Sequence, residues 1–216
     1  MEQKVKEAVE LLLNPKSAKR ESGAKRLRKL ESIESGPYLV QALEKEIADV
    51  RTWSTQYHLI LAIGHSQYEA ALPFLMKLAK ENFEATILYS GLGDSIFRLL
   101  SISHTVDDSL EQVYAFDNYI LTKGAFRALA LLHIVPDDST ISELLNKASD
   151  PRAIEAVKGY PNDQTGLRLW VAAASAGWRE ELKSKFLDDC STIQDGRLTL
   201  AVENSRKGKY VKWGPY

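Results

Sequence analysis

Apolar residues recur along the chain at the spacing of amphipathic α-helices, most clearly in residues 51–80. In the first half of this segment Trp53, Tyr57 and the apolar run that follows leave almost no polar face, which is typical of a helix covered on several sides. In the second half apolar residues at i, i+3, i+4 and i+7 lie opposite charged ones, so one stripe would be buried. We predict two helices, the first ended by Gly64 and the polar residues after it, the second with Pro73 in its first turn.

Similar helical patterns fill the rest of the chain. The other predicted helices span residues 2–13, 16–35, 37–47, 83–100, 106–114, 119–134, 139–147, 151–159, 167–176, 179–189 and 197–204. The apolar stripes of successive first helices end at Leu30, Ile63, Leu99 and Leu131, which are 33, 36 and 32 positions apart. Such a period is typical of helical solenoids. The alternative is an irregular all-α domain with chance spacing.

The predicted fold is all-α, a single right-handed α–α superhelix of about five helical hairpins, because one hairpin cannot bury its own apolar face. It would span residues 1–216, with a capping helix in residues 1–14 and an irregular tail in residues 205–216. No alternating β-branched run bounded by hairpin-turn signals occurs, so no strands are predicted.

Composition narrows the function classes. A formal net charge of −1 and a pI near 6.4 argue against a protein whose main task is to coat nucleic acid. Cys190 is the single cysteine, which excludes an internal disulfide and favours a reducing, cytoplasmic setting. No stretch approaches the ~20 apolar residues of a membrane span, and the start of the chain mixes Glu and Lys with apolar residues, unlike a signal peptide.

Arg51 with the stretch QYHLILAIG (Gln56 to Gly64), and EAALPFLMKLA (Glu69 to Ala79) after a short turn, resemble a bacterial HEAT repeat of the armadillo-type superhelix class. The resemblance covers nearly the whole chain in degenerate form, with copies of different length after Asp150. It implies a stack of hairpins whose inner helices line a concave surface that binds other proteins. Some proteins of this kind are immunity proteins that neutralise bacterial toxins, and others are alkylpurine DNA glycosylases.

Asp94 stands out because a carboxylate in an otherwise apolar helix must be paired or must face water. Arg98 follows four residues later, in the favourable acid-first order for an ion pair. Three interpretations stay open: a structural ion pair, a charge pair presented to a partner, and, from the glycosylase resemblance, the acid of a base-excising pocket. The last would need a basic groove, which the overall charge does not favour.

Aromatic residues near the starts of inner helices, with polar residues on the same helices, form the predicted protein-binding surface. An apolar body with one polar atom suits an interface anchor, although it suits packing between hairpins equally well. Together with Asp94 and Arg98, the surface comprises Trp53, Gln56, Tyr57, Tyr89, Tyr119, Lys123, Arg127, Arg168 and Trp170.

Two basic segments have simpler explanations than a ligand. The run from Lys16 to Lys29 fits a solvated helix surface, or else an acidic partner or RNA. The tail of residues 206–213 forms a second basic and aromatic cluster, and a cap over the last hairpin explains its apolar residues equally well. No histidine is followed by Glu and no phosphate-binding loop occurs, so no metal, cofactor or catalytic residue is predicted. We therefore predict a non-enzymatic scaffold whose partner is another protein and which has no membrane association. The alternative is a nucleic-acid-binding or DNA base-excising protein.

Overall fold

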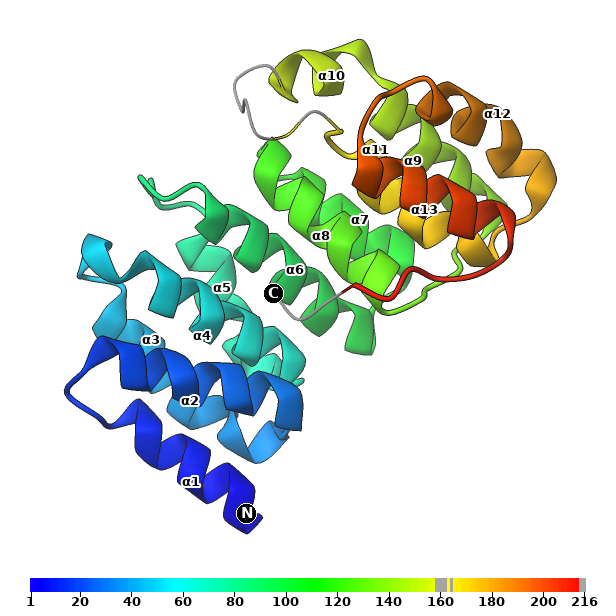
Figure 1. Ribbon diagram of the computed structural model, residues 1–216. Helices are drawn as coiled ribbons and strands as arrows, with labels where there is room; N and C mark the ends of the chain where they lie inside the picture. The colour runs from blue at the N-terminus through cyan, green and yellow to red at the C-terminus, as the bar shows by residue number, and fades with distance from the viewer. Residues whose placement is uncertain (158–162, 164, 214–216) are drawn as a thin grey trace. The chain divides into compact units, whose positions relative to one another are not determined.

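The computed structural model in Figure 1 describes residues 1–157, 163 and 165–213. All regular elements in these residues are helices, and none is a strand, which confirms the predicted all-α class. The chain forms two compact units, Met1–Ala125 and Phe126–Tyr216, and the boundary between them lies within one helix, α8 (Tyr119–Leu131). The single domain and the right-handed superhelix stay predictions.

The first unit is built of helical hairpins joined by short turns, several of which contain a 3₁₀ helix. Its helices are α1 (Gln3–Leu12), α2 (Ser17–Leu30), η1 (Ile33–Ser35), α3 (Gly36–Glu46), η2 (Val50–Thr52), α4 (Trp53–His65), η3 (Glu69–Ala71), α5 (Leu72–Leu78), α6 (Ile87–Ser103), α7 (Val106–Tyr114) and the first part of α8. In Figure 1, α2, α4 and α6 form one layer and α3, α5 and α7 the other. α4 packs between α2 and α6 in its own layer and also contacts α3.

The central helix α4 is buried on nearly every side, as its apolar pattern predicts. Every residue from Leu59 to Gly64 is buried, whereas α5 buries only the stripe of Leu75 and Leu78. α4 ends at His65, within the end predicted at Gly64 and the polar residues after it. Gly64 itself is still helical, and a Cβ at this position would lie 2.6 Å from the Cα of Ser95 on α6. Gly64 therefore permits close approach of α4 and α6.

Close packing continues between α6 and the first part of α8. A Cβ on Gly93 would lie 1.8 Å from the carbonyl oxygen of Leu121, and one on Gly124 would lie 2.1 Å from that of Ser90. Both contacts are with backbone, which cannot move aside as a flexible side chain can. Gly93 and Gly124 therefore let the backbones of these two helices touch directly.

The second unit contains the rest of α8 and the helices that follow it. These are α9 (Asp138–Ser149), α10 (Pro151–Val157), α11 (Arg168–Ala174), η4 (Ser175–Gly177), α12 (Glu180–Ser191) and α13 (Gly196–Arg206). The last two residues of the helix predicted at 151–159 lie outside the described residues. After Arg206 the chain is irregular as far as residue 213, in agreement with the predicted tail.

A buried lysine joins two helices of the second unit. The Nζ atom of Lys183 donates hydrogen bonds to the carbonyl oxygens of Ser175 and Ser205, both at 3.0 Å. These carbonyls lie near the C-terminal ends of α11 and α13, where helices leave acceptors without partners of their own. Lys183 therefore neutralises two helix ends in the core of this unit.

Candidate functional site

A row of acidic, basic and histidine side chains crosses the α2–α4–α6 layer of the first unit. On α2, Glu21 forms an ion pair with Lys25 and lies 3.9 Å from the Nε2 atom of His58 on α4. Glu31, just after α2, lies 3.1 Å from the Nδ1 atom of His65. We define this charged row as Glu21, Lys25, Arg28, Glu31, His58, His65, Asp94 and Arg98. With both histidines neutral, its three acidic and three basic residues give a net charge of zero.

Asp94 and Arg98 form the end of the charged row on α6. Arg98 donates a hydrogen bond from Nε to the Asp94 carboxylate at 2.8 Å, and Asp94 is only 1% exposed. A carboxylate so deeply covered is poorly placed to meet a flipped-out base or a partner side chain. The geometry therefore favours the structural interpretation of the pair, in which Arg98, half-buried, is the member that reaches the surface.

An apolar edge borders the charged row at the N-terminal ends of α4 and α6. Trp53 is 47% exposed and Ile87 is 40% exposed. One turn further along each helix, Tyr57 and Gly91 are in contact, since a Cβ on Gly91 would lie 3.0 Å from the Tyr57 ring. By the i, i+4 relation Trp53 and Ile87 lie on the same seam. Half-buried Tyr57 joins them, so these three side chains define the apolar edge.

Two residues of the predicted surface use their polar atoms for hydrogen bonds to backbone groups of the protein itself. Gln56 is 2% exposed, and its amide nitrogen donates to the carbonyl oxygens of Glu46 and Asp49. The hydroxyl of Tyr89 donates to the carbonyl of Glu81 and accepts from the amide of Phe83. Gln56 therefore holds the connection from α3 to α4, and Tyr89 holds the connection from α5 to α6. The hydrogen bonds of Tyr89 stabilise a linker at Phe83, where the sequence predicted the start of a helix. That helix, α6, begins instead at residue 87.

The remaining predicted residues fall on both sides of the unit boundary. Half-buried Tyr119 and Lys123 belong to the first unit, and half-buried Arg127 belongs to the second. Arg168 lines a pocket of about 280 Å³ in the second unit. Trp170 is 5% exposed, and Trp213 packs against it edge to face, with ring centroids 5.3 Å apart. Trp170 is thus covered by the tail and is not an open anchor.

The two histidines of the charged row are held neutral. Burial, together with the nearby charges of Lys25 and Arg28, lowers the pKa of His58 to about 4, against the opposing effect of Glu21. Burial and the charge of Arg98 lower the pKa of His65 below its usual value, although Asp94 and Glu31 oppose the change. His58 is 7% exposed, and no hydrogen-bond partner meets its Nδ1 atom among the described residues. At neutral pH the row therefore carries no histidine charge.

Acidification is expected to destabilise the first unit through His58. The unfolded chain takes up this proton near the ordinary pKa of 6.5 and the folded chain only near 4, so stability falls as the pH drops through this window. Between pH 6.5 and about pH 5 the expected loss in the free energy of unfolding is about 2 kcal/mol. Urea unfolding of wild type and His58→Gln at both pH values measures it, with exposed His104→Gln as the matched control. Equal acid sensitivity of His58→Gln and wild type would contradict this assignment.

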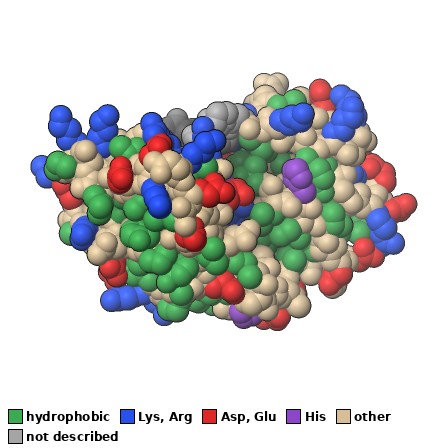
Figure 2. Space-filling view, turned by 90° about the horizontal axis from the view of Figure 1, so that it is seen from below, with side chains coloured by type: hydrophobic (Ala, Val, Ile, Leu, Met, Phe, Trp, Pro, Cys, Tyr) green, Lys and Arg blue, Asp and Glu red, His purple; other side chains and the backbone are tan. Residues whose placement is uncertain are grey.

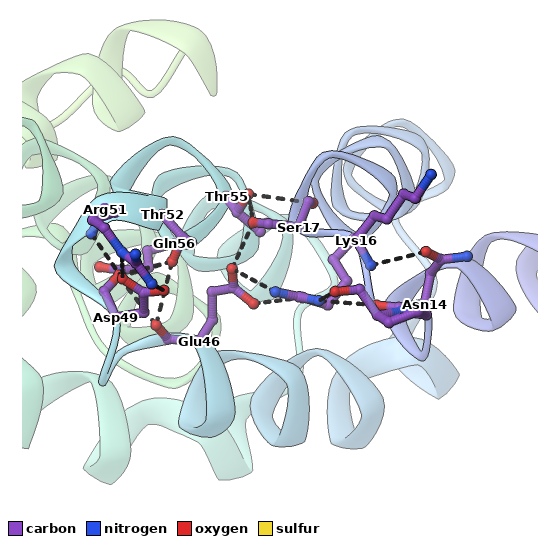
Figure 3. A network of polar contacts seen from close by, with 11 residues as sticks. Asn14, Lys16, Ser17, Glu46, Asp49, Arg51, Thr52, Thr55 and Gln56 are labelled. Atoms are coloured by element: carbon purple, nitrogen blue, oxygen red, sulfur yellow. Dashed lines mark hydrogen bonds and ion pairs between the residues drawn. The ribbon is translucent and has the colours of Figure 1, made fainter.

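A buried network in the first unit, shown in Figure 3, escaped the sequence analysis. The Glu46 carboxylate, 3% exposed, receives Nε and Nη2 of Arg20 at 2.5 and 2.9 Å and the hydroxyl of Ser17 at 2.7 Å. Burial raises the pKa of Glu46, but these hydrogen bonds outweigh it and hold the pKa below its usual value. The sequence pattern placed Arg20 in a basic run typical of a solvated helix surface. No local signal links it to Glu46, which lies 26 positions away.

Beside this network lies a half-open pocket of about 320 Å³ between α1, α2 and α3. The apolar side chains of Val9, Leu12 and Tyr38 line it, together with Arg20 and Glu46. Because Arg20 also donates to the carbonyls of Asn14 and Pro15, its charge is used within the protein. The lining of the pocket is therefore mixed, with apolar side chains, the paired charges of Arg20 and Glu46, and the side chains of Gln41 and Lys45.

The surface charge, the possible metal ligands and the hydropathy of the helices were compared with what other kinds of site require. On the face seen in Figure 2, basic side chains are scattered among acidic and hydrophobic ones. No group of three or more His, Cys, Asp or Glu in the described residues is arranged to hold a metal ion. Within the same residues, no helix has both the length and the hydropathy needed to cross a membrane.

Comparisons with protein-family models, curated proteins and solved structures give no match. The HEAT resemblance stays a prediction.

Proposed function

We propose that the chain is a protein-binding module that contacts its partner through the α2–α4–α6 layer of its first unit. The observation that carries the proposal is the exposure of Trp53, 47%, at the end of a helix that is otherwise buried on nearly every side. A tryptophan costs free energy when it is left in water, and tryptophans are enriched among the residues that dominate protein interfaces. Trp53 with Ile87 and Tyr57 would form the apolar centre of such an interface.

The charged row supports a protein partner over a nucleic acid. Its three acidic and three basic members balance in number, whereas a phosphate backbone requires a basic excess. Charges of both signs suit a protein surface with complementary charges and would set its orientation. Neutralisation of a toxin is one form of this function, and we place it in the cytoplasm because buried, isolated Cys190 suits a reducing compartment. Base excision is disfavoured because Asp94 is covered.

The first test identifies the partner and then removes the anchor. Tagged protein recovered from its source cells, with and without nuclease, is expected to retain one stoichiometric protein in both samples. Trp53→Ala is then expected to weaken binding of that protein about 30-fold, or about 2 kcal/mol, with little change in stability. Calorimetric titration and thermal unfolding measure the two effects.

Two variants make the test specific. Leu200→Ala removes a side chain of similar exposure, 45%, in the second unit and is expected to leave the affinity unchanged. Asp94→Asn is expected to lower stability while the affinity is retained. Loss of binding in Asp94→Asn at unchanged stability would overturn the structural role of Asp94. Recovery that disappears with nuclease would transfer the proposal to nucleic acid.

A further inference from the structure

The last described residues form an extended segment that returns along the second unit. We call residues 207–213 the strap. Gly208, with φ of +63°, reverses the chain after α13, and the amide of Lys209 donates to the carbonyl of Asn204 at 2.9 Å. Beyond Lys209, no backbone–backbone hydrogen bond ties the strap to other described residues. In Figure 1 the strap, drawn in red, runs back beside α13. Side chains must therefore hold it in place.

Two aromatic side chains fasten the strap. The ring of Tyr210 stacks on His133 with centroids 3.9 Å apart, and its hydroxyl sits over Gly177, where a Cβ would lie 2.5 Å away. At the far end Trp213 packs edge to face on Trp170 of α11. The Arg197 guanidinium of α13 lies 5.5 Å from the centroid of the Trp213 ring, at cation–π distance.

The surface under Trp213 has the composition of a peptide-binding site. α11 and α13 pack side by side and present Trp170 and Arg197 near their N-terminal ends. An aromatic ring beside a guanidinium favours an incoming aromatic side chain. The incoming ring can pack edge to face on the first ring and present its own face to the guanidinium. Trp213 supplies that ring from within the same chain, and it does so on a segment that lacks the hydrogen bonds of a strand or helix. Such a segment can be exchanged without breaking secondary structure.

We propose that the Trp170–Arg197 surface is a docking site for an extended segment of a partner protein that carries a tryptophan, and that the strap occupies this site as an intramolecular competitor. A tethered segment acts at a high effective concentration, so the site is closed until a partner of higher affinity displaces Trp213. The proposal concerns the second unit alone and does not depend on the function proposed for the α2–α4–α6 layer.

The test opens the site in the full-length chain and offers the strap sequence in trans. The probe is a fluorescein-labelled synthetic peptide with the sequence of residues 207–213, KGKYVKW, followed by fluorescence anisotropy. Trp213→Ala is expected to bind it at least about 10-fold more tightly than wild type, because the internal competitor is lost. The same peptide with Ala in place of its Trp, and the double variant Trp213→Ala/Trp170→Leu, are expected to show no binding.

A second variant keeps the outcome decisive. Tyr210→Ala loosens the strap at its other anchor and is expected to increase peptide binding as well, with the fold of both variants checked by circular dichroism. Equal binding to wild type and to both variants, or no binding to folded variants, would overturn the proposal. Unfolding of both variants at 25 °C would also overturn it, because the strap would then be an integral part of the core.

Discussion

Gly93→Ala is expected to lower the free energy of unfolding by about 3 kcal/mol, in spite of the better helix propensity of alanine. The new Cβ would lie 1.8 Å from the carbonyl oxygen of Leu121, well inside contact distance. Because the obstacle is the backbone of α8, relief requires α6 and α8 to move apart and to lose buried contacts along both helices. Chemical unfolding of the variant and wild type measures the difference.

Gly196→Ala is the matched control for this substitution. Gly196 is also helical, at the start of α13, but a Cβ there would meet no atom within 4 Å. Removing a glycine from such a site is expected to leave stability unchanged or to raise it by about 0.5 kcal/mol. If both variants lost the same stability, helix propensity and not the contact between α6 and α8 would be the cause.

Arg20→Ala is expected to lower the free energy of unfolding by about 3–5 kcal/mol. The substitution leaves the Glu46 carboxylate buried without the guanidinium that donates two hydrogen bonds to it, and Arg51, also drawn in Figure 3, is paired with Asp49 instead. The loss should shrink at acidic pH, because protonation of Glu46 removes the unpaired charge. Urea unfolding at neutral pH and near pH 4 measures both effects.

Arg51→Ala separates this effect from that of a surface ion pair. Arg51 forms a comparable contact with Asp49 at 2.8 Å, but its side chain is 85% exposed. The expected loss of stability there is much smaller, since water replaces the lost partner. The double variant Arg20→Met/Glu46→Leu, which removes both charges, should recover much of the stability lost in Arg20→Ala. Failure to recover would indicate that Arg20 acts through packing and not through its charge.

The local pattern of the sequence accounts for most of the helices. Apolar spacing located each predicted helix that lies in described residues, and it distinguished buried α4 from one-sided α5. Local interactions explain this success, because side chains three and four positions apart share a helix face whatever surrounds them. The pair of Asp94 and Arg98, four positions apart on α6, was predictable for the same reason.

Part of the candidate site could also be predicted from sequence. Trp53 and Tyr57 follow from the apolar pattern, and both lie at the apolar edge. Sequence could not distinguish exposed Trp53 from covered Trp170, because the residue that covers Trp170 lies 43 positions further along the chain, at Trp213. Gln56 and Tyr89 were misassigned because their acceptors are backbone carbonyls of turns whose geometry the sequence pattern does not specify.

By itself, then, the sequence determined the all-α class, the approximate extent of the helices and the helix faces that are apolar. Tertiary structure alone decided that Glu46 pairs with Arg20, that Gly64 is a contact point between helices, and that Trp170 is covered. The physical reason is the separation along the sequence of the residues that interact. Helix formation depends on neighbours within one or two turns, whereas burial of a charge, a backbone contact or an aromatic ring depends on residues brought together only by packing.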